Sequence, residues 1–184
     1  MPPVAEPELL PVAQARAGDE QSWRILFQRF QLPLYAYLFP MVRNEQTCRD
    51  LIQETFINAL RHVGSLREDG KFGSWLFGIA HQKCLLHWRK EHRDVWSEEP
   101  PVDQPDEDAE QPGALLLRVE QAAEVRQKLE QLPPPQRAVL LLHYLEDFSV
   151  EEIAEITATP VGTVKSRLHH ARRALRVLME ENSP

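Results

Sequence analysis

Residues 149–172 read SVEEIAEITATPVGTVKSRLHHAR, and their spacing predicts two helices joined by a tight turn. Ser149 and Glu152 have the spacing of a capping box, in which the serine hydroxyl meets a backbone N–H and the glutamate reaches back to the start of the helix. Thr159 is predicted to cap the second helix, with Pro160 at its first position, where the missing N–H costs nothing. We expect the first helix to end near Ile156 and the second near residue 179.

Small residues around the predicted turn favour a close crossing of these helices. Ala154 is small, Ala158 lies in the turn, and Val164 is expected in the core beside Ile153 and Leu168. This spacing is typical of a helix-turn-helix, whose second helix enters the DNA major groove with its N-terminal half. The simpler interpretation of the same residues is an amphipathic helix with a solvated basic face.

The second helix carries no acid although the protein is acidic overall. The net charge is -7, yet no Asp or Glu falls between Ile156 and Met179. A carboxylate there would face the DNA backbone, where each phosphate that a Lys or Arg neutralises releases counterions. The residues that we expect to contact DNA are Thr163, Lys165, Ser166, Arg167, His169, Arg172 and Arg173.

Most of the negative charge lies upstream, between Asp94 and Leu117. This segment holds eight acids and four prolines but no Lys or Arg. Such a composition cannot bury enough apolar surface to offset its ordering entropy. We therefore expect a flexible acidic linker over 94–114, between small domains at 1–93 and 115–184.

Helical periodicity dominates both predicted domains, and no segment alternates apolar and polar residues as a strand would. The predicted fold is all-α. Expected helices span 6–17, a segment that follows the N-cap Asp19, 45–62 after the cap Asn44, 74–93, 115–132 and 136–145. Pro33 and Pro40 should kink or break the second helix. The expected core residues are Trp23, Leu26, Phe27, Phe30, Leu51, Ile52, Thr55, Phe56, Ala59, Leu60, Trp75, Leu76, Phe77 and Ile79.

Three stretches together resemble one protein family. Residues 132–175, LPPPQRAVLLLHYLEDFSVEEIAEITATPVGTVKSRLHHARRAL, are similar to the C-terminal domain of the extracytoplasmic-function (ECF) sigma factors of bacterial RNA polymerase, in the sigma-70 family. Residues 50–60, DLIQETFINAL, resemble the polymerase-binding helix of the family's first domain. Residues 72–90, FGSWLFGIAHQKCLLHWRK, resemble the helix that engages the minus-ten promoter element. The family usually has Gly at the turn position of Ala158, where a left-handed backbone costs another residue about 1 kcal/mol.

The resemblance implies a non-catalytic factor that directs core polymerase to promoters and assists their opening. It implies polymerase contacts at Asp50, Gln53 and Glu54, and minus-ten contacts at His81, Gln82, Lys83, Arg89 and Lys90. The C-terminal helix-turn-helix would read the minus-thirty-five element. The loop 64–73 resembles the family's specificity loop, which holds a base flipped from the non-template strand. Family members are often held by an anti-sigma factor.

Other functions stay open on the sequence alone: a self-sufficient helix-turn-helix regulator, a sigma-like adaptor that sequesters another protein, and an enzyme. The enzyme is disfavoured because His143, His169 and His170 have no nucleophile or carboxylate pair at useful spacing. His81 and Cys84 have the spacing of two metal ligands but lack a third, so we expect no metal and no cofactor. The two separated cysteines, the absence of a signal peptide and the lack of a long apolar run predict a soluble cytoplasmic protein.

Overall fold

The computed structural model describes residues 10–91 and 127–180, and within these ranges it contains helices and no strand. This confirms the predicted all-α class. The helices of the N-terminal part are α1 (Val12–Arg16), α2 (Glu20–Val42), α3 (Glu45–His62), the short 3-10 turns η1 (Val63–Ser65) and η2 (Asp69–Lys71), and α4 (Phe72–Glu91). The C-terminal part contains α6 (Pro134–Leu145), α7 (Val150–Thr157) and α8 (Val161–Glu180). The predicted linker 94–114 and most of the predicted helix 115–132 lie outside the described residues.

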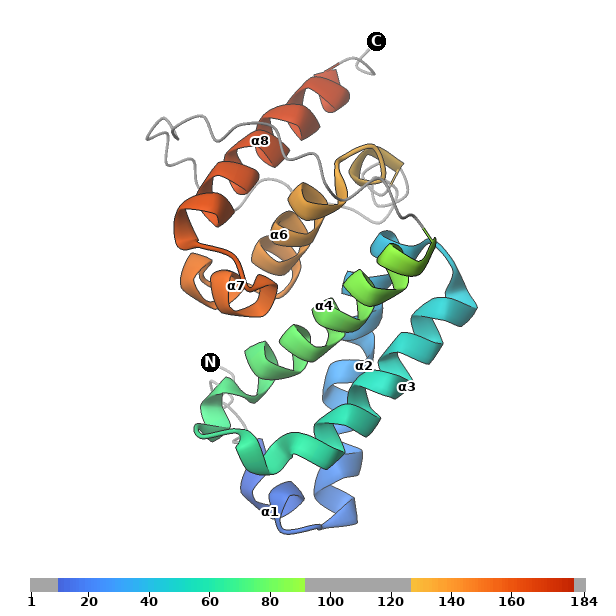
Figure 1. The fold of residues 1–184 in the computed structure, drawn as a ribbon, viewed down its shortest axis with the longest axis vertical. Helices are drawn as coiled ribbons and strands as arrows, with labels where there is room; N and C mark the ends of the chain where they lie inside the picture. Colours follow the sequence, from blue (N-terminus) through green and yellow to red (C-terminus); the bar gives the residue numbers. More distant parts are fainter. Residues whose placement is uncertain (1–9, 92–126, 181–184) are drawn as a thin grey trace, which may run out of the picture.

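The N-terminal domain is a bundle of α2, α3 and α4, with α1 at one end (Figure 1). The predicted caps are confirmed. An Asp19 carboxylate oxygen accepts from the Ser22 N–H at 2.8 Å, and the Asn44 side-chain oxygen accepts from the Thr47 N–H at 2.9 Å. Each side chain satisfies one of the backbone donors that a helix N-terminus leaves unpaired.

The predicted break at the two prolines of α2 does not occur. The helix continues through Pro33 and Pro40 to Val42. Each proline removes one backbone hydrogen bond, but three apolar side chains near them are fully buried: Leu34, Tyr37 and Leu38. Burial of a large apolar side chain contributes about 1.5–3 kcal/mol, so packing against α3, α4 and α6 keeps this segment helical.

Most of the predicted N-terminal core is correct, with exceptions at the edges of the helix faces. Leu26, Leu76 and Phe77 are fully buried, whereas Phe27 and Leu60 remain 40% and 58% exposed. The Phe27 ring lies against the Phe56 ring, with centroids 4.8 Å apart, at the rim of the core. Periodicity identifies which face of a helix is apolar, but it does not say where the neighbouring helix stops covering that face.

The C-terminal domain confirms the predicted capping box and turn. The Ser149 hydroxyl accepts from the Glu152 N–H at 3.2 Å, while a Glu152 carboxylate oxygen accepts from the Ser149 N–H at 2.9 Å. Ala158 adopts the left-handed conformation, with φ 51° and ψ 42°, which ends α7 sharply. A non-glycine residue accepts this conformation at a cost of about 1–2 kcal/mol.

The predicted cap of α8 is displaced by one residue. The Pro160 carbonyl accepts the first helical hydrogen bond, from the Val164 N–H at 3.1 Å, and α8 begins at Val161. The Thr157 hydroxyl donates to the Ile153 carbonyl, so the Thr159 hydroxyl donates to the Thr157 oxygen at 2.8 Å. This bond turns the Thr159 side chain toward the end of α7 and away from the N–H groups that it was predicted to cap.

The two domains lie against each other in the structure. The α4 helix packs against α7, and α2 packs against α6 (Figure 1). The buried apolar residues of both domains form one continuous cluster. None of the described helices is both long enough and apolar enough to pass through a bilayer.

Candidate nucleic-acid interface

The helix-turn-helix predicted from the sequence is present in the C-terminal domain. Ile153 of α7 and Val164 of α8 are fully buried, and Leu168 is 3% exposed. These side chains hold α7 across the first turns of α8, as the Ala–turn–Val spacing predicts. The arrangement leaves the opposite face of α8 available, which is the geometry with which such a motif enters a major groove.

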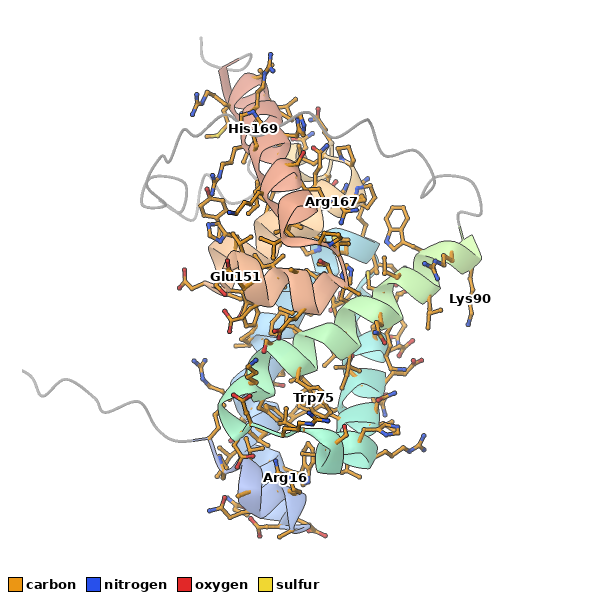
Figure 2. The ribbon with its side chains drawn as sticks, turned by 60° about the vertical axis from the view of Figure 1, so that its left-hand side comes forward. Arg16, Trp75, Lys90, Glu151, Arg167 and His169 are labelled. Atoms are coloured by element: carbon orange, nitrogen blue, oxygen red, sulfur yellow. The ribbon has the colours of Figure 1, made fainter. Side chains whose placement is uncertain are left out.

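The seven predicted DNA contacts on α8 are unequally accessible. Lys165 and Arg173 are exposed, Ser166 is only 5% exposed, and the other four are half-buried. The half-buried residues are Thr163, Arg167, His169 and Arg172. Figure 2 shows Arg167 on the end of α8 nearer to α4 and His169 farther along the helix. Ser166 is therefore not on the accessible surface that the sequence assigned to it.

Arg172 is held in place by a residue that the sequence analysis missed. Its Nε donates to the Tyr144 hydroxyl at 2.7 Å, and its guanidinium carbon lies 5.6 Å from the centre of the Tyr144 ring. Tyr144 is on α6, which packs along α8. The hydrogen bond and the cation–π contact together restrict the Arg172 side chain before any ligand arrives. No sequence signal connects positions 144 and 172.

His81 does not lie on the surface that was predicted to read the minus-ten element. It is 4% exposed, and its Nδ1 lies 2.7 Å from the Tyr37 hydroxyl oxygen. Burial, and secondarily the charge of Arg167 on α8, lowers the pKa of His81 to about 4. This prediction is corrected: in this arrangement the imidazole is a neutral interior group between α2, α4 and α8.

The remaining predicted minus-ten residues lie along the outer side of α4. Gln82, Arg89 and Lys90 are exposed, and Figure 2 shows Lys90 near the C-terminal end of the helix. The Lys83 Nζ is 3.0 Å from a carboxylate oxygen of Glu54 on α3. The structure thus pairs a predicted DNA contact with a predicted polymerase contact.

The predicted polymerase-binding residues form one exposed face on α3. Asp50, Gln53 and Glu54 are all exposed, and a carboxylate oxygen of Asp50 accepts from the Gln46 side-chain amide at 2.9 Å. Two apolar side chains extend this face, Ile57 at 44% exposed and Leu60 at 58%. Polar groups around an apolar centre are typical of a protein–protein contact.

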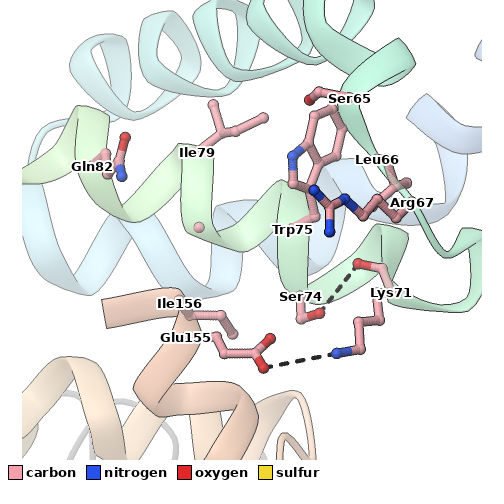
Figure 3. A pocket seen from close by; sticks show the side chains of 11 residues that line it. Ser65, Leu66, Arg67, Lys71, Ser74, Trp75, Ile79, Gln82, Glu155 and Ile156 are labelled. Atoms are coloured by element: carbon pink, nitrogen blue, oxygen red, sulfur yellow. Dashed lines mark hydrogen bonds and ion pairs between the residues drawn. The ribbon is translucent and has the colours of Figure 1, made fainter. Parts of the chain in front are cut away.

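A cavity of about 450 Å³ lies between the 63–71 segment, α4 and α7 (Figure 3). It is lined by Ser65, Leu66, Arg67, Lys71, Ser74, Trp75, Gly78, Ile79, Gln82, Glu155 and Ile156. Trp75 and Ile79 are half-buried: they pack against the core, as predicted, and they also line this space. The Lys71 Nζ is 3.7 Å from a Glu155 carboxylate oxygen across it. The sequence indicated the loop but not the tryptophan or the contribution of α7.

The other sequence candidates concern metals and thiols. Cys48 and Cys84 are buried free thiols, and burial raises the pKa of each to about 12. Among the described residues, no group of three His, Cys, Asp or Glu side chains lies close enough to hold a metal ion.

Comparison with known proteins gives concordant matches to both domains. The family model for Sigma-70 region 2 matches residues 26–94, and the model for Sigma-70, region 4 matches residues 122–175. The RNA polymerase sigma-H factor of Pseudomonas aeruginosa is 34% identical over 172 residues, which cover 89% of each chain. The ECF RNA polymerase sigma factor SigW of Bacillus subtilis is 30% identical over 173 residues, covering 90% of this chain and 92% of SigW.

Two solved structures share the fold. CnrH, in complex with the cytosolic domain of CnrY, aligns with a TM-score of 0.68 and 22% identity over 94% of this chain and 96% of CnrH. The sigma factor RpoE of Bartonella quintana, in complex with the anti-sigma factor NepR, aligns with a TM-score of 0.63 and 22% identity over 87% of this chain and 99% of RpoE. At this identity the likeness concerns the fold.

Proposed function

The chain belongs to the ECF sigma factors of the sigma-70 family, which direct core RNA polymerase to promoters, and from this we propose which of its surfaces perform each part of that task. Sigma factors are initiation factors and catalyse no reaction themselves. We assign minus-thirty-five reading to α8, minus-ten reading to α4 with the 63–71 segment, and polymerase docking to α3.

The observation that supports the first assignment is the packing of α7 across α8. It leaves Lys165 and Arg173 exposed on a helix that carries no acid before Glu180. Thr163 and Lys165, near the N-terminal end, are placed to reach base edges, whereas Arg172 and Arg173 are placed for phosphates on the flank. Tyr144 orients Arg172, so less side-chain freedom is lost when a phosphate binds.

The second assignment rests on the cavity beside Trp75. A flipped base needs an aromatic or apolar surface to stack on and polar groups for its edge, and the cavity offers Trp75 and Ile79 together with Ser65, Ser74 and Gln82. Arg67 and Lys71 supply positive charge at its rim for the adjoining phosphates. Arg89 and Lys90 continue this charge along α4.

The third assignment rests on the exposed face of α3. Asp50, Gln53 and Glu54 present acids and an amide beside the exposed Ile57 and Leu60. We propose that this face docks on core polymerase, with the apolar pair extending the polar residues toward the C-terminal end of α3. The 94–114 segment would link the two domains, so that binding of one raises the effective concentration of the other.

The decisive experiment is transcription from a genomic DNA library with core polymerase and the purified full chain. We expect enriched start sites that share a two-part upstream motif. Gln53→Ala should reduce transcription while leaving the helical circular dichroism unchanged. The matched control is Gln21→Ala, at an exposed glutamine on α2 and outside the α3 face. A DNA-binding regulator would bind its operator equally well with either change and would not stimulate core polymerase.

A protein inhibitor and a cytoplasmic location follow as further parts of the proposal. The CnrH and RpoE structures are complexes with the cytosolic domain of CnrY and with the anti-sigma factor NepR. By analogy we propose that an anti-sigma factor binds this chain, and that it acts in the cytoplasm with polymerase. Co-purification of a stoichiometric partner that blocks transcription in the library assay would test the first point.

A further inference from the structure

The side chain of Arg16 joins the short helix α1 to the segment 63–71. Its Nη2 donates to the Leu66 carbonyl at 3.1 Å and to an Asp69 carboxylate oxygen at 2.5 Å, and its Nε donates to the Val63 carbonyl at 3.5 Å. Val63 begins η1, Asp69 begins η2, and Leu66 lies between these turns. A guanidinium holds its donors in one rigid plane, so a single side chain fixes three points of the segment relative to one another.

The helix that carries Arg16 is itself firmly placed. Val12 is fully buried, and Ala15 is 2% exposed. The Trp23 indole Nε1 on α2 donates to the Ala15 carbonyl at 2.9 Å, and the Trp23 ring meets the Phe72 ring at the start of α4, with centroids 6.4 Å apart. Arg16 therefore extends from a backbone that is tied to both α2 and α4, and little further ordering is needed for it to hold the segment.

The two turns of the segment are each closed locally. The Leu66 N–H donates to the Val63 carbonyl at 3.1 Å, and the Lys71 N–H donates to the Glu68 carbonyl at 3.0 Å. Each of these bonds stays within one turn, whereas the contacts of Arg16 reach both. Val63 and Leu66 are only 6% and 9% exposed, so the inner side of the segment is packed on the core and should stay folded without the arginine. What Arg16 adds is the position of one turn relative to the other.

The segment also forms one wall of the cavity beside Trp75. Four of its residues line that space: Ser65, Leu66, Arg67 and Lys71. Arg16 is not among the lining residues. Figure 2 shows Arg16 on α1 and Trp75 on α4, toward the same end of the bundle. Arg16 can therefore act on the cavity only through the segment that it holds.

We propose that Arg16 is a positioning residue for minus-ten reading: by holding the 63–71 segment, it sets the shape of the cavity beside Trp75 and so decides how strongly the cavity prefers one base. The proposal rests on the proposed function, which assigns this cavity to a flipped base. Hydrogen-bonding groups discriminate between bases only when they are held close to one geometry. A loosened wall should therefore weaken binding of the preferred base and leave the other three bases, which do not fit the wall, almost unaffected.

Three substitutions separate positioning from simpler roles of Arg16. Arg16→Gln removes the charge and the planar fork of donors. Arg16→Lys keeps the charge, which would serve a direct phosphate contact, but one ammonium group cannot reproduce the fork. Asp69→Ala removes one of the three contacts and leaves the two carbonyl contacts in place.

Two matched controls change the same kinds of charge outside this contact. Arg24→Gln alters an exposed arginine on α2, and Glu68→Ala alters an exposed acid within the segment itself. Arg16 pairs with Asp69 and not with Glu68, so a loss of charge near the cavity is separated from a loss of support.

The measurement is binding of single-stranded DNA by the holoenzyme, that is, the full chain with core polymerase. The probes are fluorescent oligonucleotides that carry the minus-ten motif enriched in the library experiment, with each of the four bases placed in turn at each position. Wild type should prefer one base at the flipped position by about tenfold. Arg16→Gln and Arg16→Lys should lose most of this preference through weaker binding of the preferred base, and Asp69→Ala should lose part of it. Preferences at the other positions, and both controls, should match wild type.

Two results would overturn the proposal. One is an unchanged base preference in Arg16→Gln. The other is an equal loss of affinity for all four bases. If Arg16→Lys restores that affinity and Arg16→Gln has a shallower salt dependence, Arg16 contacts phosphate directly; if Arg16→Lys does not restore it, the role of Arg16 is only structural.

Hydrogen exchange of the full chain alone keeps this proposal separate from the proposed function. Arg16→Gln should reduce amide protection in the segment 63–71, including the Leu66 N–H, while α3 and α4 keep theirs. If protection falls in this way but the wild-type holoenzyme selects no start sites, Arg16 holds the segment, the proposed function is wrong, and the base-selecting role falls with it. If wild type selects start sites but Arg16→Gln keeps full protection and the same base preference, the function stands and the proposal is wrong.

Discussion

The two helices assigned to promoter reading, α4 and α8, are alike in sequence and different in the structure. Both are 20 residues long and both carry several basic side chains. On α8, Lys165 and Arg173 are exposed, and Arg172 is oriented from behind by Tyr144. On α4, His81 is buried and Lys83 is paired with Glu54. The neighbours of each helix therefore decide which of its basic side chains are accessible.

The difference has a physical origin in what packs behind each helix. The α8 helix buries a single stripe, including Val164, Leu168 and Leu175, against α6 and α7. The α4 helix contacts α2 and α3 on one side and α7 on the other. If α7 moves away, the side chains of α4 should become as exposed as those of α8. The predictions below test this comparison, from the largest expected effect to the smallest.

The largest effect is expected from Arg137, which joins the domains. Arg137→Ala should lower the free energy of unfolding by about 3–5 kcal/mol, because four carbonyl groups, that of Pro40 on α2 and three in residues 129–132, lose this buried donor. Urea denaturation of the full chain measures this. Arg49→Ala is the control, since Arg49 pairs with Glu45 on the exposed surface of α3 and should change stability by less than about 0.5 kcal/mol. Equal effects would mean that Arg137 does not hold α2 and α6 together.

The second prediction concerns pH and the buried side of α4. The pKa of His81 is lowered from 6.5 to about 4, so the folded chain keeps the imidazole neutral. The corresponding stability is fully present above pH 6.5 and is lost as the pH falls toward 4. The loss corresponds to about 3 kcal/mol. Because Glu146 titrates in an overlapping range with the opposite sign, denaturant titrations should show this decline in Glu146→Gln and a flatter profile in the double variant His81→Gln/Glu146→Gln.

Glu146 changes stability in the opposite direction over an overlapping pH range, so the two slopes nearly cancel in wild type. Burial raises the pKa of this carboxyl from 4.5 to about 7, while Arg29 opposes the shift. Its contribution is fully present below pH 4.5 and is lost as the pH rises toward 7. His81→Gln combined with Glu146→Gln should therefore remove both slopes. A wild-type profile that is unchanged by His81→Gln would contradict the assignment of the acid-side slope to His81.

The sequence predicted α8 better than α4. The signals for α8 are local, whereas the surroundings of α4 depend on residues far away in the chain. Capping boxes, prolines and the Ala–turn–Val spacing are local signals, so the roles of Ser149, Glu152 and Ala158 follow from the residues beside them. Burial of His81 depends on Tyr37 and Arg167, which are 44 and 86 positions away, and no local pattern reports such contacts. The same limit explains Trp75, whose side chain packs at the edge of the core, as predicted, but also lines the cavity shared with α7.

Proline and cap positions show the limit within a single helix. Pro33 and Pro40 are strong local signals for a break, yet the buried surface around Tyr37 and Leu38 keeps α2 continuous. Thr159 is a good cap by type, but its hydroxyl pairs with Thr157. At the prolines, contacts that depend on the folded chain outweigh a propensity of about 3 kcal/mol; at Thr159, a contact two residues away decides instead.

A smaller effect is expected from Tyr144, which supports α8. Tyr144→Phe removes the hydroxyl that accepts from the Arg172 Nε but keeps the ring. Affinity for minus-thirty-five duplex should fall by about 1 kcal/mol, the net value of one hydrogen bond. The salt dependence should stay the same because no charge is removed. Fluorescence anisotropy at two or three salt concentrations measures both quantities.

The control for Tyr144 is the same change at another tyrosine. Tyr35 lies on α2 with its ring stacked on Phe39, centroids 5.3 Å apart, and is remote from the helix-turn-helix. Tyr35→Phe should leave duplex affinity unchanged. If Tyr144→Phe also leaves duplex affinity unchanged, the Arg172 side chain does not need support from α6. The proposed difference between α8 and α4 would then rest only on how much of α4 is covered.

The smallest effect is expected from the ion pair between Lys71 and Glu155, which joins the cavity rim to α7. Both side chains are largely exposed, at 49% and 62%, and the charged atoms are 3.7 Å apart. Exposed pairs contribute about 0.2–1 kcal/mol and are screened by salt. Glu155→Lys should therefore loosen the packing of α7 on α4 only slightly, at low ionic strength, with a small increase in the radius of gyration. Adding Lys71→Glu restores opposite charges and should restore compaction, whereas a purely structural role of Glu155 within α7 would leave the double variant as expanded as the single one.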